Sequence, residues 1–316
     1  MLRALGELKR CGRIVRRHGS GTYVATPDAM PPLSPLPSEG ASNTIVVIAK
    51  PDHGFFDYCV AQLYASADNR DYEIVYQLIR SQHEAIQDLR PVVGQAAGFI
   101  LFGYTLAPIA RTLQDAGNRV VIVGSPDADE IGSVPIVCSD HATGGALAVK
   151  HLLDFGHRRI AFTAYYLEEL RSPRWLGYRS AMDEARRNGV AVSEMVVARE
   201  HIDGWRANPQ AAYEYFAQPD APTALVAWND FTAAPILDVL QRAKVRVPED
   251  VSVIGYDNMP IAERLTPQLT TIDSGVPQLL SAAIRIVTAS VRTAPTTLQM
   301  TIPNLVVRNS VTHPRS

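Results

Sequence analysis

Between residues 44 and 257, short apolar runs rich in Val, Ile and Phe alternate with longer mixed segments. The apolar runs have the length of buried β-strands, and the segments between them have the length of helices. Strands that alternate with helices of about 10–15 residues predict a parallel sheet covered by helices. We expect strands at 44–49, 72–76, 98–102, 120–123, 136–138, 160–164, 194–198, 224–227 and 251–254. We expect helices at 56–67, 84–89, 107–116, 142–155, 175–188, 209–217 and 231–243.

The number of predicted strands indicates how many sheets the chain forms. Roughly ten strands precede Asp257, which is more than one ordinary doubly wound sheet holds. Two sheets in two lobes fit this number better. The chain of 316 residues is long enough for two domains, and its 47% hydrophobic content is sufficient for two cores. The predicted fold class is therefore α/β with two Rossmann-like lobes.

The composition also bears on the compartment. No apolar run approaches the roughly 18–20 residues needed to span a bilayer, and the first residues lack the apolar segment of a secretory signal. The three cysteines, Cys11, Cys59 and Cys138, are widely spaced and form neither a metal cluster nor a disulfide framework. We expect a protein of the reducing cytoplasm without a membrane partner.

Motifs of the common enzyme classes are missing from this sequence. It contains no GxSxG nucleophile elbow, no HExxH pair and no P-loop, and its eight histidines are scattered. His151 and His157 lack cysteine or carboxylate partners at metal-ligand spacing. We therefore expect a protein that is not an enzyme and uses no metal or cofactor.

Positive charge is concentrated at the N-terminal end. Residues 1–24 carry six Arg and Lys residues against Glu7 alone, whereas the whole chain has a net charge of −2. A basic end on an acidic body predicts a contact with a polyanion at that end. A basic terminus that is simply solvated is the alternative.

A short helix over 2–10 and a hairpin over 14–24 with a glycine-rich tip are expected in this basic segment. The run ALGELKRCGRIVRRHGSGTYVA resembles the last helix and wing of a GntR-type winged helix-turn-helix domain. The resemblance implies that the wing lies against DNA phosphates, where arginines supply charge and glycines let the backbone approach. The implied DNA contacts are Arg16, Arg17, His18, Gly19 and Gly21.

The match to the winged helix-turn-helix family is partial. A complete domain of this type has two helices and a strand-like segment before this point, so most of the base-reading element is absent. Either the sequence begins inside a longer protein, or the protein has lost DNA binding; the retained charges of the wing favour the first interpretation. We expect a winged-helix remnant at 1–26 and an extended, proline-rich linker at 27–43.

The remainder of the chain resembles the sensor domain of the LacI/GalR family of transcriptional regulators. The matching runs are SDHATGGALAVKHLLDFGHRRIAF, RWLGYRSAM, PTALVAWNDFTAAPILDVLQRAKVRVPEDVSVIGYDNMPIAERLTPQLTTI and LVVRNS. The resemblance implies a type I periplasmic-binding-protein-like sensor domain over 44–311, with a small ligand between two lobes joined by three crossovers. The implied lobe 1 comprises 44–157 and 276–301, and lobe 2 comprises 158–275 and 302–311.

Arg174 and Asp257 match ligand-binding positions of this family, and Asn229, which follows a predicted strand, is a third candidate. Arg174 offers a planar fork of donors that suits vicinal hydroxyls or a carboxylate, although it could be a surface arginine at a helix start. Asn229 suits a sugar hydroxyl, although it or Asp230 could cap the following helix. Asp257 follows a predicted strand and could accept two hydroxyl groups, or it could be satisfied locally in a turn.

Five further residues are weaker candidates for the ligand site. Trp205 follows a turn-like segment and could cover the apolar face of a sugar or lie in the core. His53, Phe55 and Phe56 follow the first strand, where the family has an aromatic residue near the ligand, but the run PDHGFF departs from the usual pattern. Asp140 could contact the ligand or cap the helix that follows it.

Taken with these resemblances, the chain is predicted to be a DNA-binding transcriptional regulator. A sugar or sugar derivative would bind in the sensor domain and change the operator affinity of a homodimer. A GntR-type head on a LacI-type sensor resembles the arabinose-repressor arrangement, which makes arabinose one candidate ligand. The alternative is a stand-alone or transport-type sugar-binding protein, which the intact wing and the lack of a signal peptide disfavour.

Overall fold

The computed structural model describes residues 14–17, 21–24, 43–50, 55–65, 72–79, 89, 93, 95–125, 134–289 and 298–315. The chain forms two compact units, each with its own sheet of mostly parallel strands. Unit 1 comprises Met1–Asp52, Cys59–Val137 and Leu280–Gln299, and unit 2 comprises His53–Tyr58, Cys138–Leu279 and Met300–Ser316. The predicted two-sheet α/β fold is therefore confirmed.

Unit 2 contains a six-stranded sheet in the order β14-β12-β11-β10-β8-β9. Neighbouring strands pair in parallel except β12 and β14, which are antiparallel. The strands are β8 (Arg159–Ala164), β9 (Ser193–Ala198), β10 (Ala224–Val226), β11 (Ser252–Tyr256), β12 (Thr270–Asp273) and β14 (Asn304–Val306). The helices are α5 (His141–Asp154), α6 (Pro173–Arg187), α7 (Arg199–Ala207), α8 (Pro209–Phe216), α9 (Asp230–Arg242) and α10 (Pro260–Arg264), with a 3-10 turn at Leu167–Arg171.

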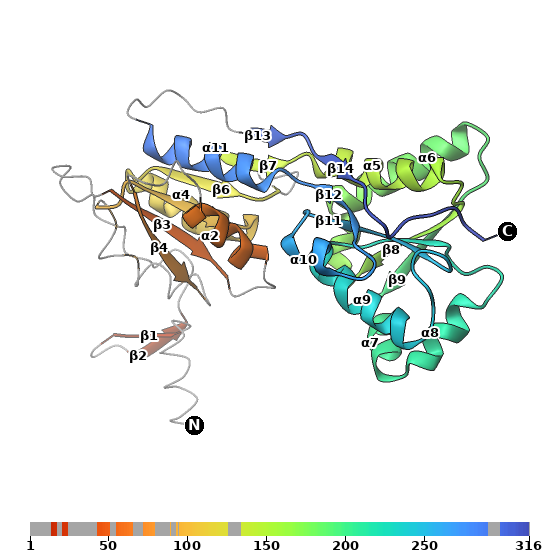
Figure 1. The fold of residues 1–316 in the computed structure, drawn as a ribbon. Coiled ribbons are helices and arrows are strands. Elements are labelled where there is room, and N and C mark those ends of the chain that lie inside the picture. Colours follow the sequence, from red (N-terminus) through yellow and green to blue (C-terminus); the bar gives the residue numbers. More distant parts are fainter. Residues whose placement is uncertain are drawn as a thin grey trace. The chain divides into compact units, whose positions relative to one another are not determined.

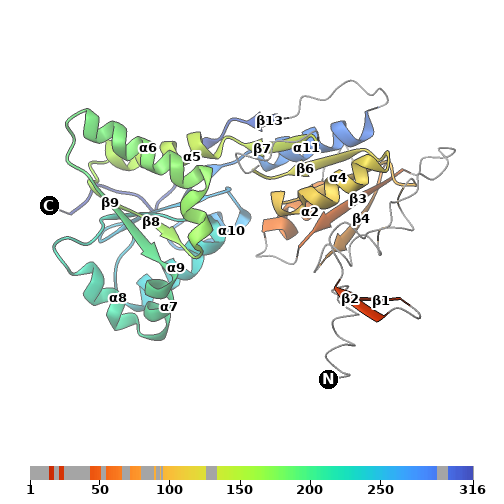
Figure 2. The same cartoon turned by 180° about the vertical axis from the view of Figure 1, so that it is seen from behind.

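Helices cover both faces of this sheet, with α5 and α6 on one side and α7, α8 and α9 on the other (Figures 1 and 2). Successive residues of each strand point to opposite faces. On β8, Ile160 and Phe162 join the core beneath α5 and α6, whereas Ala161 joins the core beneath α7 to α9. Because both faces are buried, the strands are continuous apolar runs, which explains why they could be located in the sequence.

Unit 1 contains the second six-stranded sheet, in the order β13-β7-β6-β5-β3-β4. Every residue of β5 is buried, so both faces of this sheet are covered as well. The strands are β3 (Thr44–Ala49), β4 (Glu73–Leu78), β5 (Gly98–Phe102), β6 (Val120–Val123), β7 (Ile136–Ser139) and β13 (Leu298–Thr301). Its helices are α4 (Ala107–Asp115) and the greater parts of α2 (Phe55–Ala65) and α11 (Val276–Thr288), whose first residues are assigned to unit 2. A 3-10 turn lies at Tyr104–Leu106.

The boundary between the units lies earlier than we expected from the sequence. Unit 1 ends at Val137 in its central segment, whereas the resemblance placed the end of lobe 1 at residue 157. The difference arises because α5 packs closely against α6 of unit 2: Gly145 faces the Arg174 carbonyl, and Gly177 faces the Ala142 carbonyl. The whole of α5 therefore belongs with the second sheet.

The N-terminal hairpin is present as β1 (Ile14–Arg17) paired antiparallel with β2 (Gly21–Val24). Of the predicted DNA contacts, Arg16 and Arg17 lie in β1 and Gly21 begins β2. The structure does not describe His18, Gly19, the helix expected at 2–10 or residues 27–42 of the linker expected at 27–43. Among the residues that the structure describes, no helix has the length and apolar character required to cross a membrane.

Candidate functional site

The carboxyl ends of β8, β10 and β11 meet at one edge of the unit 2 sheet, where ligands bind in open parallel sheets. Asp257 directly follows β11, Asn229 follows β10, and Arg174 lies in the first turn of α6, which follows β8. The fold thus gathers three predicted ligand residues from distant parts of the sequence at one edge. Arg174 and Asp257 are in direct contact.

The Arg174 guanidinium has polar and aromatic contacts on several sides. Its Nη2 lies 3.0 Å from Oδ1 and 3.3 Å from Oδ2 of Asp257, and its Nη1 donates to the Trp228 carbonyl at 2.7 Å. The guanidinium also lies over two aromatic rings, 4.0 Å from the centroid of Tyr256 and 4.7 Å from that of Trp228. The cation–π contacts and the separate partners of Nη1 and Nη2 together fix the plane of the guanidinium. Arg174 is therefore preorganised.

The Arg174–Asp257 ion pair is buried, with exposed fractions of 9% for Arg174 and 2% for Asp257. Burial raises the pKa of Asp257, and the Arg174 guanidinium and the nearby Ser274 hydroxyl oppose that rise. The positive charge of Arg174 is balanced inside the site. A buried pair of this kind is sensitive to loss of either partner, which leaves an uncompensated charge.

The turn after β11 sets the direction of the Asp257 side chain. Asp257 has φ 90° and Asn258 has φ 48°, which is the left-handed region that non-glycine residues rarely adopt. The Asp257 amide donates to the Ile272 carbonyl of β12 at 2.7 Å. Such a conformation persists where the surrounding structure fixes it, and it is common at functional sites.

His141, the first residue of α5, is a member of this cluster that the sequence did not reveal. Its Nδ1 lies 3.1 Å from the Tyr256 hydroxyl and 3.4 Å from the Nε of Arg174. Because an arginine Nε can only donate, Nδ1 accepts and the imidazole proton resides on Nε2. Burial and the Arg174 charge hold the pKa of His141 well below its usual value, so the ring is neutral. His141 is also partly exposed and presents an N–H donor.

Two predicted ligand residues cap helices. The Asn229 side chain accepts from the Thr232 amide at 2.9 Å and caps α9, and Asp140 accepts from the Thr143 amide at 3.0 Å and caps α5. The capping alternatives are therefore both realised, with Asn229 rather than Asp230 as the cap of α9. Asn229 adjoins Trp228 at the site, so its amide group remains a candidate for contact with a ligand.

Trp205 lies away from this cluster, in the core of unit 2. It is 3% exposed, and its ring centroid lies 5.1 Å from that of Tyr215 and 5.3 Å from that of Phe216. The segment expected to form a turn is part of α7, which directs Trp205 inward. This burial favours the core interpretation. The tryptophan beside Arg174 is Trp228, whose place next to Asn229 at a strand end was the available signal in the sequence.

The first-lobe candidates are described only in part. Phe55 and Phe56 open α2, and their ring centroids are 5.8 Å apart in an edge-on arrangement. Both side chains are partly buried. His53 lies outside the described residues. The role of Phe55 and Phe56 at a ligand remains a prediction.

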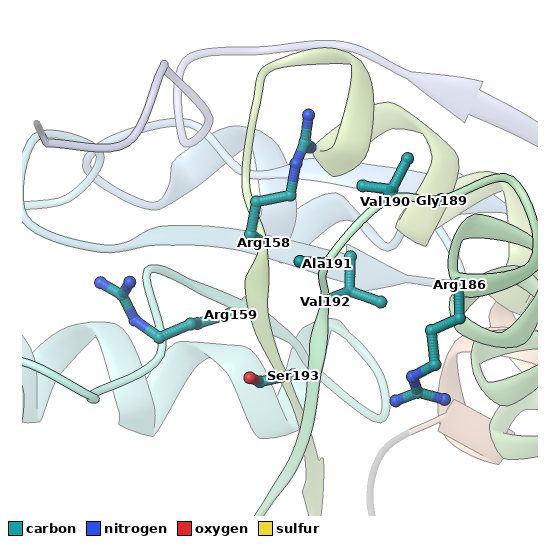
Figure 3. Close-up of a pocket in the computed structure, with 8 residues that line it drawn as sticks. All are labelled: Arg158, Arg159, Arg186, Gly189, Val190, Ala191, Val192 and Ser193. Atoms are coloured by element: carbon teal, nitrogen blue, oxygen red, sulfur yellow. The ribbon is translucent and has the colours of Figure 1, made fainter.

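A pocket of about 580 Å³ lies at the opposite edge of the same sheet, near the amino ends of β8 and β9. The guanidinium groups of Arg158, Arg159 and Arg186 at its rim point in different directions (Figure 3). Arg158 and Arg159 donate to backbone carbonyls, and Arg186 pairs with Asp183 and Glu194. Because these donors do not converge, the pocket lacks the arrangement of a specific anion site.

Residues 149–311 match the family of periplasmic-binding-protein-like domains. The match covers half of the chain and includes Arg174, Asn229 and Asp257. The chain therefore belongs to that family, in agreement with its two parallel sheets and with the cluster at a sheet edge.

The curated relatives are transcriptional repressors. The chain is 36% identical over 175 residues to the repressor PurR of Photobacterium profundum, covering 53% of this chain and 50% of the relative. It is 38% identical over 176 residues to PurR of Vibrio cholerae, covering 55% of this chain and 51% of the relative. The chain thus spans about half the length of the curated relatives it matches.

Solved structures of LacI-type regulators have the same fold. A LacI transcriptional regulator from a Rhodococcus species is 26% identical with a TM-score of 0.66, covering 86% of this chain and 99% of that one. A LacI family regulator from Enterococcus faecium with bound ribose is 22% identical with a TM-score of 0.68, covering 86% and 100%. The regulator CelR in a cellobiose complex is 24% identical with a TM-score of 0.67, covering 86% of each chain. All these proteins are named as regulators, which agrees with the expectation of a protein that is not an enzyme.

Proposed function

We propose that this chain is the effector-binding part of a LacI-type transcriptional regulator and that its effector is a neutral sugar or sugar derivative. The observation that carries the proposal is the preorganised cluster of Arg174, Asp257 and His141 at the carboxyl edge of the unit 2 sheet. The fold and the repressor relatives support the regulatory role. The choice of a sugar as the effector is suggested by the ribose and cellobiose that are bound to two of the similar regulators.

The charge balance of the cluster favours a neutral ligand. Arg174 already pairs with Asp257, and its Nη1 and Nε already make contacts, so it has little positive charge to offer an anion. A hydroxyl group can donate to the Asp257 carboxylate and accept from the Nε2–H of His141. The Trp228 ring, which is partly exposed, could cover an apolar sugar face. A sugar can use the carboxylate acceptor, the imidazole N–H donor and the aromatic ring together.

A sugar screen by thermal shift tests the site. We expect one of D-ribose, L-arabinose and cellobiose, at about 100 times its dissociation constant, to raise the melting temperature by about 5 °C or more. Asp257→Asn keeps the size of the side chain but weakens both the pair and the hydroxyl contact, so most of this rise should disappear. The exposed Asp238 on α9 gives the matched control Asp238→Asn, which should keep the full rise. A full rise in Asp257→Asn would refute the site.

DNA binding is the second part of the proposal. The β1–β2 hairpin with Arg16 and Arg17 would contact phosphates, and the effector would shift a homodimer between states of different operator affinity. The coding DNA upstream of Met1 provides a direct test. An in-frame helix-turn-helix would support this role, and an in-frame stop codon would contradict it and favour a sugar-binding protein without a DNA-binding head.

A further inference from the structure

Asp230 is a buried carboxylate beneath the turn that carries Asp257. It is the first residue of α9 and is 0% exposed. Its Oδ2 accepts from the Met259 amide at 2.7 Å, and its Oδ1 accepts from the Thr271 hydroxyl at 2.6 Å. Asn229 already caps α9. The Asp230 carboxylate therefore acts on β12 and on the turn after β11 rather than on its own helix.

Asp230 controls the amide groups of that turn directly and through Thr271. The Met259 amide donates to Asp230 itself. The Asn258 amide donates at 3.4 Å to the Thr271 hydroxyl, which in turn donates to Asp230. The positive φ angles of Asp257 and Asn258 require such external support, because non-glycine residues seldom hold them unaided.

The end of β11 is shaped around this carboxylate. A Cβ atom at Gly255 would lie 2.0 Å from Oδ1 of Asp230. A side chain at position 255 would therefore displace either the strand or the carboxylate. The absence of a side chain at Gly255 lets β11 pass directly over the Asp230 carboxylate, which binds the turn that follows this strand.

We propose that Asp230 is a positioning residue that fixes the Asp257–Met259 turn and so directs the Asp257 carboxylate toward Arg174 and the effector. The proposal deepens the proposed function and rests on it for the effector. The inference that Asp230 fixes the turn depends only on the contacts of Asp230 and is independent of the effector.

The support that Asp230 gives to this turn should also depend on pH, because the pKa of its carboxylate lies near neutrality. Burial raises its pKa to about 7, and the charge of Asp257 adds to the rise, while hydrogen bonds from Thr271, Met259 and the Tyr256 backbone oppose it. Among the groups packed around the Asp230 carboxylate, Asp257 in the turn after β11 is charged. Its hydrogen-bond partners, Thr271 of β12 and the Met259 amide, are neutral. The ionised carboxylate accepts from both partners, whereas a protonated one has an oxygen that must donate. The turn should therefore be held less firmly as pH falls through about 7.

Amide exchange in the ligand-free protein, followed by NMR, tests the positioning role. In Asp230→Asn we expect the Met259 and Asn258 amides to exchange about tenfold faster, the size expected for loss of one charge-assisted hydrogen bond. The β11 amide of Val253 should keep its protection. Asp238→Asn, an exposed change on the same helix, should alter none of them. Thr271→Val should speed Asn258 more than Met259, because the Asp230 contact to Met259 remains.

Two outcomes of the exchange experiment would overturn the proposal. One is unchanged exchange at Asn258 and Met259 in Asp230→Asn. The other is equal acceleration at Val253, which would mean that Asp230 stabilises the unit as a whole rather than this turn.

Calorimetry with the stabilising sugar from the screen of D-ribose, L-arabinose and cellobiose tests the consequence for binding. In wild type, affinity should fall by up to about tenfold from pH 8 to pH 6, as the binding-competent ionised fraction falls. Asp230→Asn should bind about tenfold more weakly at pH 8, with a nearly flat profile. A wild-type slope that survives in Asp230→Asn would overturn the coupling. If no sugar binds wild type, the proposed function fails, whereas the exchange result still decides the role of Asp230.

Discussion

Burial has different consequences for Arg174 and His157, which lie at opposite edges of the unit 2 sheet. The Arg174 guanidinium is paired with the Asp257 carboxylate. His157 is 1% exposed, and its hydrogen-bond partners are neutral: its Nδ1 lies 2.9 Å from the Thr223 hydroxyl, and its Nε2 lies 2.8 Å from the Thr312 carbonyl. One edge thus holds a paired charge, and the other holds a neutral imidazole that joins strands to the C-terminal segment.

The neutral state of His157 predicts how stability depends on pH. Burial lowers the pKa of His157 to about 4, against about 6.5 in the unfolded chain. Because the folded pKa is the lower one, the contribution is present above pH 6.5 and is lost as pH falls toward 4. We expect about 2 kcal/mol of the free energy of unfolding to be lost between pH 7 and pH 5 through this residue.

Urea unfolding at both pH values measures this loss. His157→Gln should show a pH dependence smaller than that of wild type by about this amount, and the exposed His201→Gln should behave like wild type. An equal pH dependence in wild type and His157→Gln would contradict the assignment.

At the scale of elements, the position of Arg174 depends on how closely α5 and α6 pack. A Cβ at Gly177 would lie 1.9 Å from the Ala142 carbonyl, and one at Gly145 would lie 2.1 Å from the Arg174 carbonyl. Each helix therefore presents a glycine to the backbone of the other. This contact places the start of α6, with Arg174, beside the start of α5, with His141.

Gly177→Ala should push these helices apart. We expect a loss of about 1–3 kcal/mol in the free energy of unfolding, as for other overpacked contacts, together with weaker sugar binding because Arg174 moves. Gly204→Ala is the control: Gly204 also lies in a helix, a Cβ there would meet nothing within 4 Å, and the change should stabilise by about 0.5–1 kcal/mol. Chemical denaturation and calorimetry of both variants check the expectation. Normal stability and affinity in Gly177→Ala would show that the helices adjust without cost.

At the scale of the whole molecule, the last residues of the chain complete the fold of unit 2. The Ser310 hydroxyl is buried, accepts from the Thr270 amide at 2.8 Å and donates to the Val253 carbonyl. Arg308 reaches the Leu269 carbonyl and the Asn258 side chain, at 2.9 and 2.8 Å. The segment therefore links β11, β12 and the turn that carries Asp257.

Truncation tests this dependence. A chain that ends at Val307 should lose several kcal/mol of unfolding free energy, because removal of Arg308 and Ser310 leaves buried polar groups of β11 and β12 without partners. A chain that ends at His313 retains these contacts and the Thr312 peptide carbonyl that meets His157, so it should lose less than about 1 kcal/mol. Thermal unfolding of the two chains compares them. Equal melting temperatures would show that the C-terminal segment is dispensable.

The sequence by itself determined the class of fold and most of the buried parallel strands; it did not locate β12, β13 and β14 or the helices α7, α10 and α11. Continuous apolar runs located the buried strands, because a strand covered on both faces has no polar alternation. Asp257 and Arg174 could be proposed because a strand end and a family motif are local features of the chain. The resemblance to regulators with a periplasmic-binding-protein-like sensor was sufficient for the family.

The tertiary structure decided which side chains meet. The Arg174–Asp257 pair, the contact of His141 and the place of Trp228 depend on strands and helices far apart in the sequence, so no local pattern contains them. The same holds for Trp205, which α7 turns into the core. The roles of Asn229 and Asp230 were open because both residues can cap a helix. The tertiary contacts separate the two roles: Asn229 caps α9, whereas Asp230 binds β12 and the turn after β11.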